Sequence, residues 1–193
     1  MGSDQIYLHI RVVLAIVLGL SITKLLNGIA LLIERRDSWS LLHVSWVLWV
    51  LMSVMTFWWW EFRLSIVPVW TFATYLFVIS YCSLYFVLSA LIFPEDVEQY
   101  GGYESYLIER RYWFFGLIAL ITLMDLVDTS LKGAERWDAL GIAYQIKTAV
   151  MLVIAGTGMV LVNKRAHLAL ALVALIYLTV YYTIQYFNVT ALG

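Results

Sequence analysis

The sequence has few charged residues, few prolines and a single cysteine. Charged residues make up 13% of its 193 positions and hydrophobic residues 63%, whereas an average soluble domain has about 25% charged and about 45–50% apolar residues. The lone Cys82 excludes an intramolecular disulfide and a site built from several thiolates. A formal net charge of −1 provides no basic surface for a nucleic acid. Together with a mean hydropathy of +0.87, these shortages indicate a chain solvated by lipid.

Long apolar runs divide the chain into segments of membrane-spanning length. A helix needs about 20 apolar residues to cross a hydrocarbon layer of roughly 30 Å. The six predicted spans are Tyr7–Ile33, Leu41–Trp60, Leu64–Phe93, Tyr112–Leu131, Ala139–Val162 and Leu168–Phe187. Runs of this length are typical of helices and too long for barrel strands. The predicted fold is therefore an all-α, polytopic membrane helix bundle with six transmembrane helices.

One connection between the spans is much longer than the others. Residues 94–111, PEDVEQYGGYESYLIERR, are rich in acidic residues and in tyrosine. A solvated segment at the membrane interface is the default interpretation of such a composition. We therefore expect a single membrane-embedded domain over residues 1–193, with an acidic and Tyr-rich cytoplasmic loop at about 94–111.

Basic residues set the predicted orientation in the membrane. The connections after the first, third and fifth spans carry three basic pairs: Arg35 and Arg36, Arg110 and Arg111, and Lys164 and Arg165. Because positive residues favour the cytoplasmic side, both termini are predicted to lie outside. The tryptophans of WWWEF, residues 58–62, would then anchor the second span in the outer interfacial zone.

The general pattern of short loops between six spans, with WWWEF at a span end, is similar to that of bacterial membrane proteins with no assigned activity. The resemblance implies an integral location in a bacterial inner membrane and implies nothing about activity. The expected partners are the lipid bilayer and, for an oligomer or a complex, a second copy of the chain or another membrane protein. No nucleic acid is expected.

Four charged residues fall inside the predicted spans: Lys24, Asp125, Asp128 and Lys147. An ionised side chain at that depth costs several kcal/mol unless it is paired or hydrated. Helix rise places Lys24, Asp125 and Lys147 at overlapping depths. We therefore expect an intramembrane charge cluster in which Asp125 pairs with Lys24 or with Lys147.

Polar residues spaced like one helix face accompany these charges. Side chains three or four positions apart lie on the same side of a helix. The candidates for a polar path are Ser21, Asn27, Thr71, Thr74, Tyr81, Tyr85, Thr122 and Thr129. Such residues could line a hydrated route through a transporter, and small or hydroxyl residues also allow close packing between helices. Both interpretations remain open at the level of sequence.

His43 and His167 raise the question of a cofactor. Both fall near the predicted cytoplasmic ends of their spans, and two facing histidines can ligate a haem. No distinctive cofactor-binding pattern surrounds either residue. The prediction is therefore that there is no metal site and no cofactor, with haem as the rarer alternative.

Enzyme signatures are missing from the sequence. It contains no GxSxG nucleophile elbow, no HExxH zinc helix and no phosphate-binding loop. No catalytic residue is predicted, and two functions remain. In the first, the chain is a small transporter or channel subunit for a proton, ion or small polar solute, with the charge cluster as its site. In the second, it is a noncatalytic membrane subunit or sensor whose buried ion pairs are structural.

Overall fold

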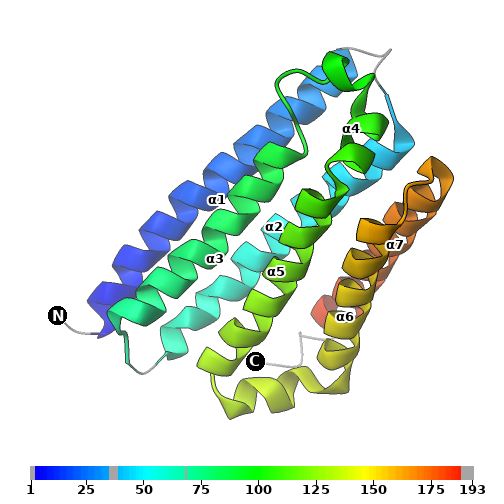
Figure 1. Ribbon diagram of the computed structural model, residues 1–193. Helices are drawn as coiled ribbons and strands as arrows, with labels where there is room; N and C mark the ends of the chain where they lie inside the picture. The colour runs from blue at the N-terminus through cyan, green and yellow to red at the C-terminus, as the bar shows by residue number, and fades with distance from the viewer. Residues whose placement is uncertain (1–2, 35–38, 68, 188–193) are drawn as a thin grey trace.

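The computed structural model describes residues 3–34, 39–67 and 69–187, which form helices and connecting segments without a strand (Figure 1). The α-helices are α1 (Ser3–Glu34), α2 (Leu41–Glu61), α3 (Phe72–Leu91), α4 (Tyr103–Glu109), α5 (Arg111–Leu131), α6 (Ala134–Val160) and α7 (Lys164–Phe187). Two short 3₁₀ helices, η2 (Phe62–Ile66) and η3 (Glu98–Tyr100), lie in the connections. Six helices, all except α4, are long and apolar enough to cross a membrane. The predicted all-α architecture is therefore confirmed at this level.

The six long helices form a closed ring. α1 packs on α3, α3 on α5, α5 on α6, α6 on α7, α7 on α2, and α2 on α1. More of α2 is buried than of any other long helix. We call the end that carries α4 the loop end, and the end where α5 is followed by α6 the cavity end (Figure 1).

Several helix starts differ from the predicted ones, including those of α1 at Ser3 and α6 at Ala134. For α3 and α7, a capping residue accounts for the observed start. α3 begins at Phe72, and not near Leu64, because the extended Thr71 accepts a hydrogen bond from the Thr74 backbone N–H at 3.1 Å. α7 begins at Lys164, four residues earlier than predicted. There the Asn163 side-chain oxygen accepts from the backbone N–H of Arg165 at 2.8 Å.

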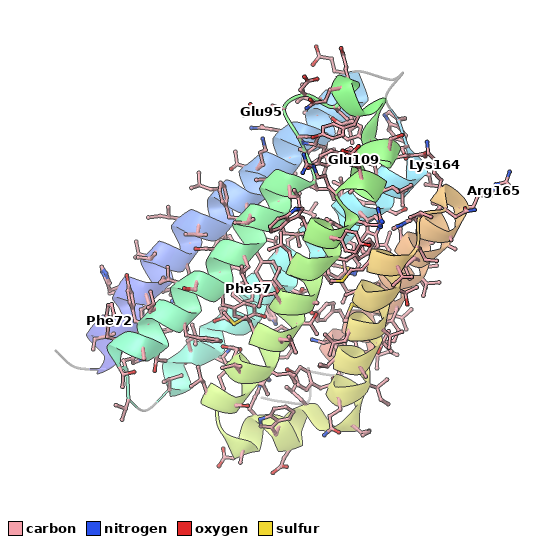
Figure 2. All side chains as sticks on the ribbon, viewed as in Figure 1. Phe57, Phe72, Glu95, Glu109, Lys164 and Arg165 are labelled. Atoms are coloured by element: carbon pink, nitrogen blue, oxygen red, sulfur yellow. The ribbon has the colours of Figure 1, made fainter. Side chains whose placement is uncertain are left out.

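Aromatic side chains fill the bundle interior toward the loop end. Trp46 of α2 meets Phe114 and Phe115 of α5 edge to face, with ring centroids 5.2 and 5.3 Å apart. Such pairs contribute about 0.5–1.5 kcal/mol each beyond the area that they bury. Phe57, further along α2, lies among the helices (Figure 2) and packs on Tyr81 and Tyr85 of α3. The aromatic packing therefore ties α2 to both α3 and α5.

α6 is kinked, and the kink shapes the cavity end. Gly141 has φ 59° and ψ −162°, a conformation that only glycine adopts without strain. The segment before it, residues 134–140, runs across the end of the bundle before the helix turns along the other helices (Figure 1). We call this segment the cross segment.

Candidate functional site

A polar cavity of about 80 Å³ lies at the cavity end, between α2, α3, α5, α6 and α7. Three acidic and three basic residues line it: Glu61, Asp125, Asp128, Lys132, Arg136 and Lys147. Tyrosines complete much of the wall, namely Tyr81, Tyr85, Tyr144, Tyr181 and Tyr182. The volume holds a few water molecules, each of which occupies about 30 Å³ in the liquid. It is too small for the drug-sized ligands of sites with roughly 300–1,000 Å³.

Asp125 and Lys147 form the ion pair that joins α5 to α6 inside the cavity. The Lys147 ammonium donates to Asp125 Oδ2 at 2.8 Å. The Lys147 Nζ atom also lies 4.8 Å from the centroid of the Tyr144 ring, a favourable position for an ammonium. The Asp125 side chain keeps 27% of its surface exposed and the Lys147 side chain 12%. Asp125 therefore pairs with Lys147, one of the two partners expected from the sequence, and this pair still reaches solvent.

Lys132 joins two carboxylates from different helices. Its ammonium donates to Asp128 Oδ2 at 2.6 Å and to Glu61 Oε1 at 3.1 Å, and all three side chains are buried. Burial opposes the charged form of Lys132, but Glu61 and Asp128 outweigh burial, so the pKa of Lys132 is raised above its ordinary value. Lys132 therefore stays protonated and holds the end of α2 against the end of α5.

Several buried polar atoms of this cluster have no hydrogen-bond partner within the described part of the chain. They are Glu61 Oε2, Asp128 Oδ1 and Arg136 Nε. Leaving such a group unsatisfied costs about 1–3 kcal/mol, and more when the group is charged. Because all three residues line the cavity, these atoms can bind a small ion or water there.

The cross segment covers the cavity. Arg136 and Leu140, both in this segment, belong to the cavity wall. The Arg136 guanidinium carbon lies 4.3 Å from the centroid of the Trp60 ring, and that of Arg63 lies 5.7 Å from the same ring. A cation over a tryptophan face contributes about 0.5–2 kcal/mol. Trp60 therefore fastens the cross segment to the end of α2, in addition to any interfacial role.

Lys24 does not belong to the cluster that the sequence predicts. It lies on α1, is partly exposed, and is not among the residues that line the cavity. α1 packs on α3, and α3 in turn packs on α5, so α3 stands between Lys24 and Asp125. The basic residues that join Lys147 in the cavity are Lys132 and Arg136.

The predicted polar path is divided in the structure. Four of its members line the cavity: Tyr81, Tyr85, Thr122 and Thr129. The other four lie elsewhere: Ser21, Asn27, Thr71 and Thr74. Ser21 donates to the backbone carbonyl of Val17, and Asn27 is exposed. Thr129 donates to the Tyr144 hydroxyl at 2.9 Å, which donates to the Asp125 backbone carbonyl at 3.0 Å. The polar residues therefore support the cavity on one side of the ring and do not line a route along α1.

Glu61, Lys132 and Arg136 are the site residues that the sequence does not single out. Each lies at a helix end, where a charge is normally solvated. One signal was present, because Asp128 and Lys132 are four residues apart and therefore share a helix face. No comparable signal connects Glu61 with them, since its contact joins residues 71 positions apart.

The two histidines are held by backbone carbonyls. His43 Nε2 donates to the carbonyl of Ile92, and His167 Nε2 donates to the carbonyl of Leu161, both at 2.8 Å. The His43 ring is also stacked on Tyr103 at 3.9 Å. The Nε2 atoms of both histidines are therefore engaged in hydrogen bonds to the backbone, near the first turns of α2 and α7.

Within the described ranges, 3–34, 39–67 and 69–187, no group of three or more His, Cys, Asp or Glu side chains could hold a metal ion. Comparisons of this chain with known protein families, with curated proteins and with solved structures gave no match.

Proposed function

We propose that the chain is an integral membrane protein and a small transporter or channel subunit for a proton or another small ion. The membrane location is supported by six helices of sufficient length and apolar character. It is also supported by large apolar side chains exposed on the outside of the ring, such as Ile16, Val153 and Ile176. Lipid is the solvent that such a surface fits.

The observation that carries the proposal is the composition of the cavity. Six acidic and basic side chains surround a space with room for only a few waters, and three of their buried polar atoms have no partner among the described residues. Ionisable groups inside membrane spans are expensive and typically mark ion pathways or proton relays. The volume of about 80 Å³ favours a proton or a small ion over a larger solute.

The structure suggests how access to the cavity could be controlled. The cavity lies close to one end of the bundle, since Asp125 is six residues, or about 9 Å of helix rise, from the end of α5. The aromatic packing around Trp46 fills the interior toward the loop end. We propose that an ion enters at the cavity end, when the cross segment moves about Gly141, and displaces Lys147 from Asp125.

A second function has one observation in its favour. Each of the three cavity carboxylates already has a lysine partner, either Lys147 or Lys132. Ion pairs that only fix helix packing would have this arrangement. In that case the chain is a noncatalytic membrane subunit, and its cavity carries no flux.

Flux through purified protein in liposomes separates the two functions. We would measure proton and monovalent-cation flux under an imposed membrane potential, for the natural chain and for Asp125→Asn combined with Lys147→Met. Removing both partners avoids a single uncompensated buried charge, so the variant is expected to fold. A matched control is Glu104→Gln combined with Lys164→Met, which removes an exposed pair of 3.6 Å at the loop end.

We expect flux from the natural chain and from the control, and little or no flux from the cavity variant, because ionisable groups inside membrane spans typically mark the ion pathway. Gel filtration would verify that all three proteins are folded. Natural protein that carries none of these ions, although it is correctly folded, would contradict the transport proposal and favour the noncatalytic subunit.

A further inference from the structure

A second concave site lies outside the charged cavity, on the side of the bundle. It is a groove of about 580 Å³ lined by Tyr7, Arg11, Leu14, Ile22, Met55, Trp58, Trp59 and Glu61. The residues from α1 extend from Tyr7 to Ile22, which corresponds to about 22 Å of helix. The groove is therefore long enough for an extended chain and has the roughly 300–1,000 Å³ of a ligand site.

The two ends of this groove differ in polarity. Leu14, Ile22 and Met55 give it an apolar floor, whereas Arg11 and two tryptophans lie toward the cavity end. Trp58 and Trp59 are 43% and 59% exposed, and tryptophan rings favour the level of lipid headgroups. An amphipathic molecule with a polar head and an apolar tail matches this polarity.

Arg11 gives the groove its charge. Its side chain is exposed and makes no hydrogen bond or ion pair within the residues that the structure describes. The acidic residue of the wall, Glu61, is only 5% exposed and is bonded to Lys132. An exposed guanidinium at this position can bind an anion, and its planar donors match phosphate oxygens.

We infer that the groove binds one phospholipid, with the phosphodiester on Arg11 and an acyl chain along Leu14, Ile22 and Met55. The inference rests on the membrane location in the proposed function, but it does not require transport. Tyr7 and the two tryptophans flank the headgroup region. Because Glu61 lines both the groove and the charged cavity, a lipid bound here lies against the wall of that cavity.

Native mass spectrometry of the full chain in detergent tests this site. The probes are phosphatidylglycerol and a diacylglycerol with the same acyl chains, which lacks the phosphate. We expect the natural chain to retain one phosphatidylglycerol and no diacylglycerol. Arg11→Gln should weaken retention by about tenfold or more, because it removes a hydrogen bond between charged groups.

Two further variants complete the test. Arg165→Gln removes an exposed arginine at the opposite, loop end (Figure 2) and should leave retention unchanged. Met55→Trp should fill the groove and abolish retention although Arg11 is present. Equal retention by the natural chain and Arg11→Gln, or equal binding of the diacylglycerol, would overturn the lipid site. Release of the chain from membranes by alkaline carbonate would instead contradict the membrane location itself.

Discussion

The two ends of the bundle interior are built from different chemistry. Toward the loop end, Trp46, Phe114 and Phe115 are at most 2% exposed and pack edge to face. Toward the cavity end, the same helices α2 and α5 carry Glu61, Asp125 and Asp128. Helices that run through both regions therefore change from a packed apolar face to a charged face along their length. The charges that line the cavity are therefore concentrated at one end of the interior, and the aromatic region at the other end is packed without them.

The ion pairs at the two ends of the bundle differ in how far their side chains are exposed to solvent. Lys132 is buried with Glu61 and Asp128, whereas Lys164 and Glu104 are 58% and 39% exposed in their side chains. Glu95, Glu109, Lys164 and Arg165 all lie toward the loop end (Figure 2). The Lys164–Glu104 pair is therefore accessible to water, whereas Lys132 and its two carboxylates are enclosed by protein.

The largest expected effect comes from breaking the buried set of charges. Lys132→Met leaves Glu61 and Asp128 close together without their shared cation. Removing one partner of a buried pair costs about 3–5 kcal/mol. Thermal unfolding in detergent should show this loss, and the triple change Lys132→Met, Glu61→Gln and Asp128→Asn should restore much of it.

Lys164→Met is the matched control at the loop end. Its exposed pair with Glu104 should contribute only about 0–1 kcal/mol. Equal losses of stability from Lys132→Met and Lys164→Met would show that the comparison between the two ends is wrong.

A smaller effect is expected from overpacking the aromatic region. A methyl group added at Gly158 of α6 would overlap the ring of Phe115, whereas one added at Gly156 of the same helix would meet no atom within 4 Å. Gly158→Ala should therefore lower the free energy of unfolding by about 1–3 kcal/mol. Gly156→Ala should be neutral or slightly stabilising, because alanine is the better helix former. Similar unfolding temperatures for the two variants would contradict the close contact.

The smallest expected effect concerns the fastening of the cross segment. Trp60→Leu removes the ring beneath Arg136 and should cost about 0.5–2 kcal/mol of stability. Trp113→Leu is the control, since Trp113 is 69% exposed and lies at the start of α5. A larger loss from Trp113→Leu would count against the role given to Trp60.

Much of the fold follows from the sequence, because length and apolar character are properties of single segments. The six long helices were predictable for that reason. Lys147 was identifiable as a cavity residue because a lysine inside a span must find a partner. The exclusion of Lys24 was not predictable, because it depends on α3 lying between α1 and α5. No local sequence pattern indicates which helices are neighbours in the ring.

The cross segment shows a second limit of the sequence. A glycine within an apolar run is compatible with a straight helix, so Gly141 gives no sign that α6 turns there. Without this turn, Arg136 and Trp137 would extend away from the bundle as an ordinary polar helix end. The kink at Gly141 places Arg136 and Leu140 of the cross segment in the cavity wall, an arrangement that the sequence pattern does not indicate.

The central claim is that water reaches the cavity from its own end of the bundle, when the cross segment moves, and that the interior toward the loop end is sealed. Single cysteines test it directly at Thr129, which lines the cavity and is only 3% exposed, and at Ser89, which is fully buried toward the loop end. Both are made in a Cys82→Ala background and placed in vesicles that expose only the cavity end, so a thiol at position 129 is reached only when the cross segment moves. A membrane-impermeant maleimide should label Thr129→Cys and leave Ser89→Cys unlabelled, while full labelling of both after unfolding verifies that the thiols are reduced. An unlabelled Thr129→Cys, or equal labelling of the two folded variants, would contradict the claim.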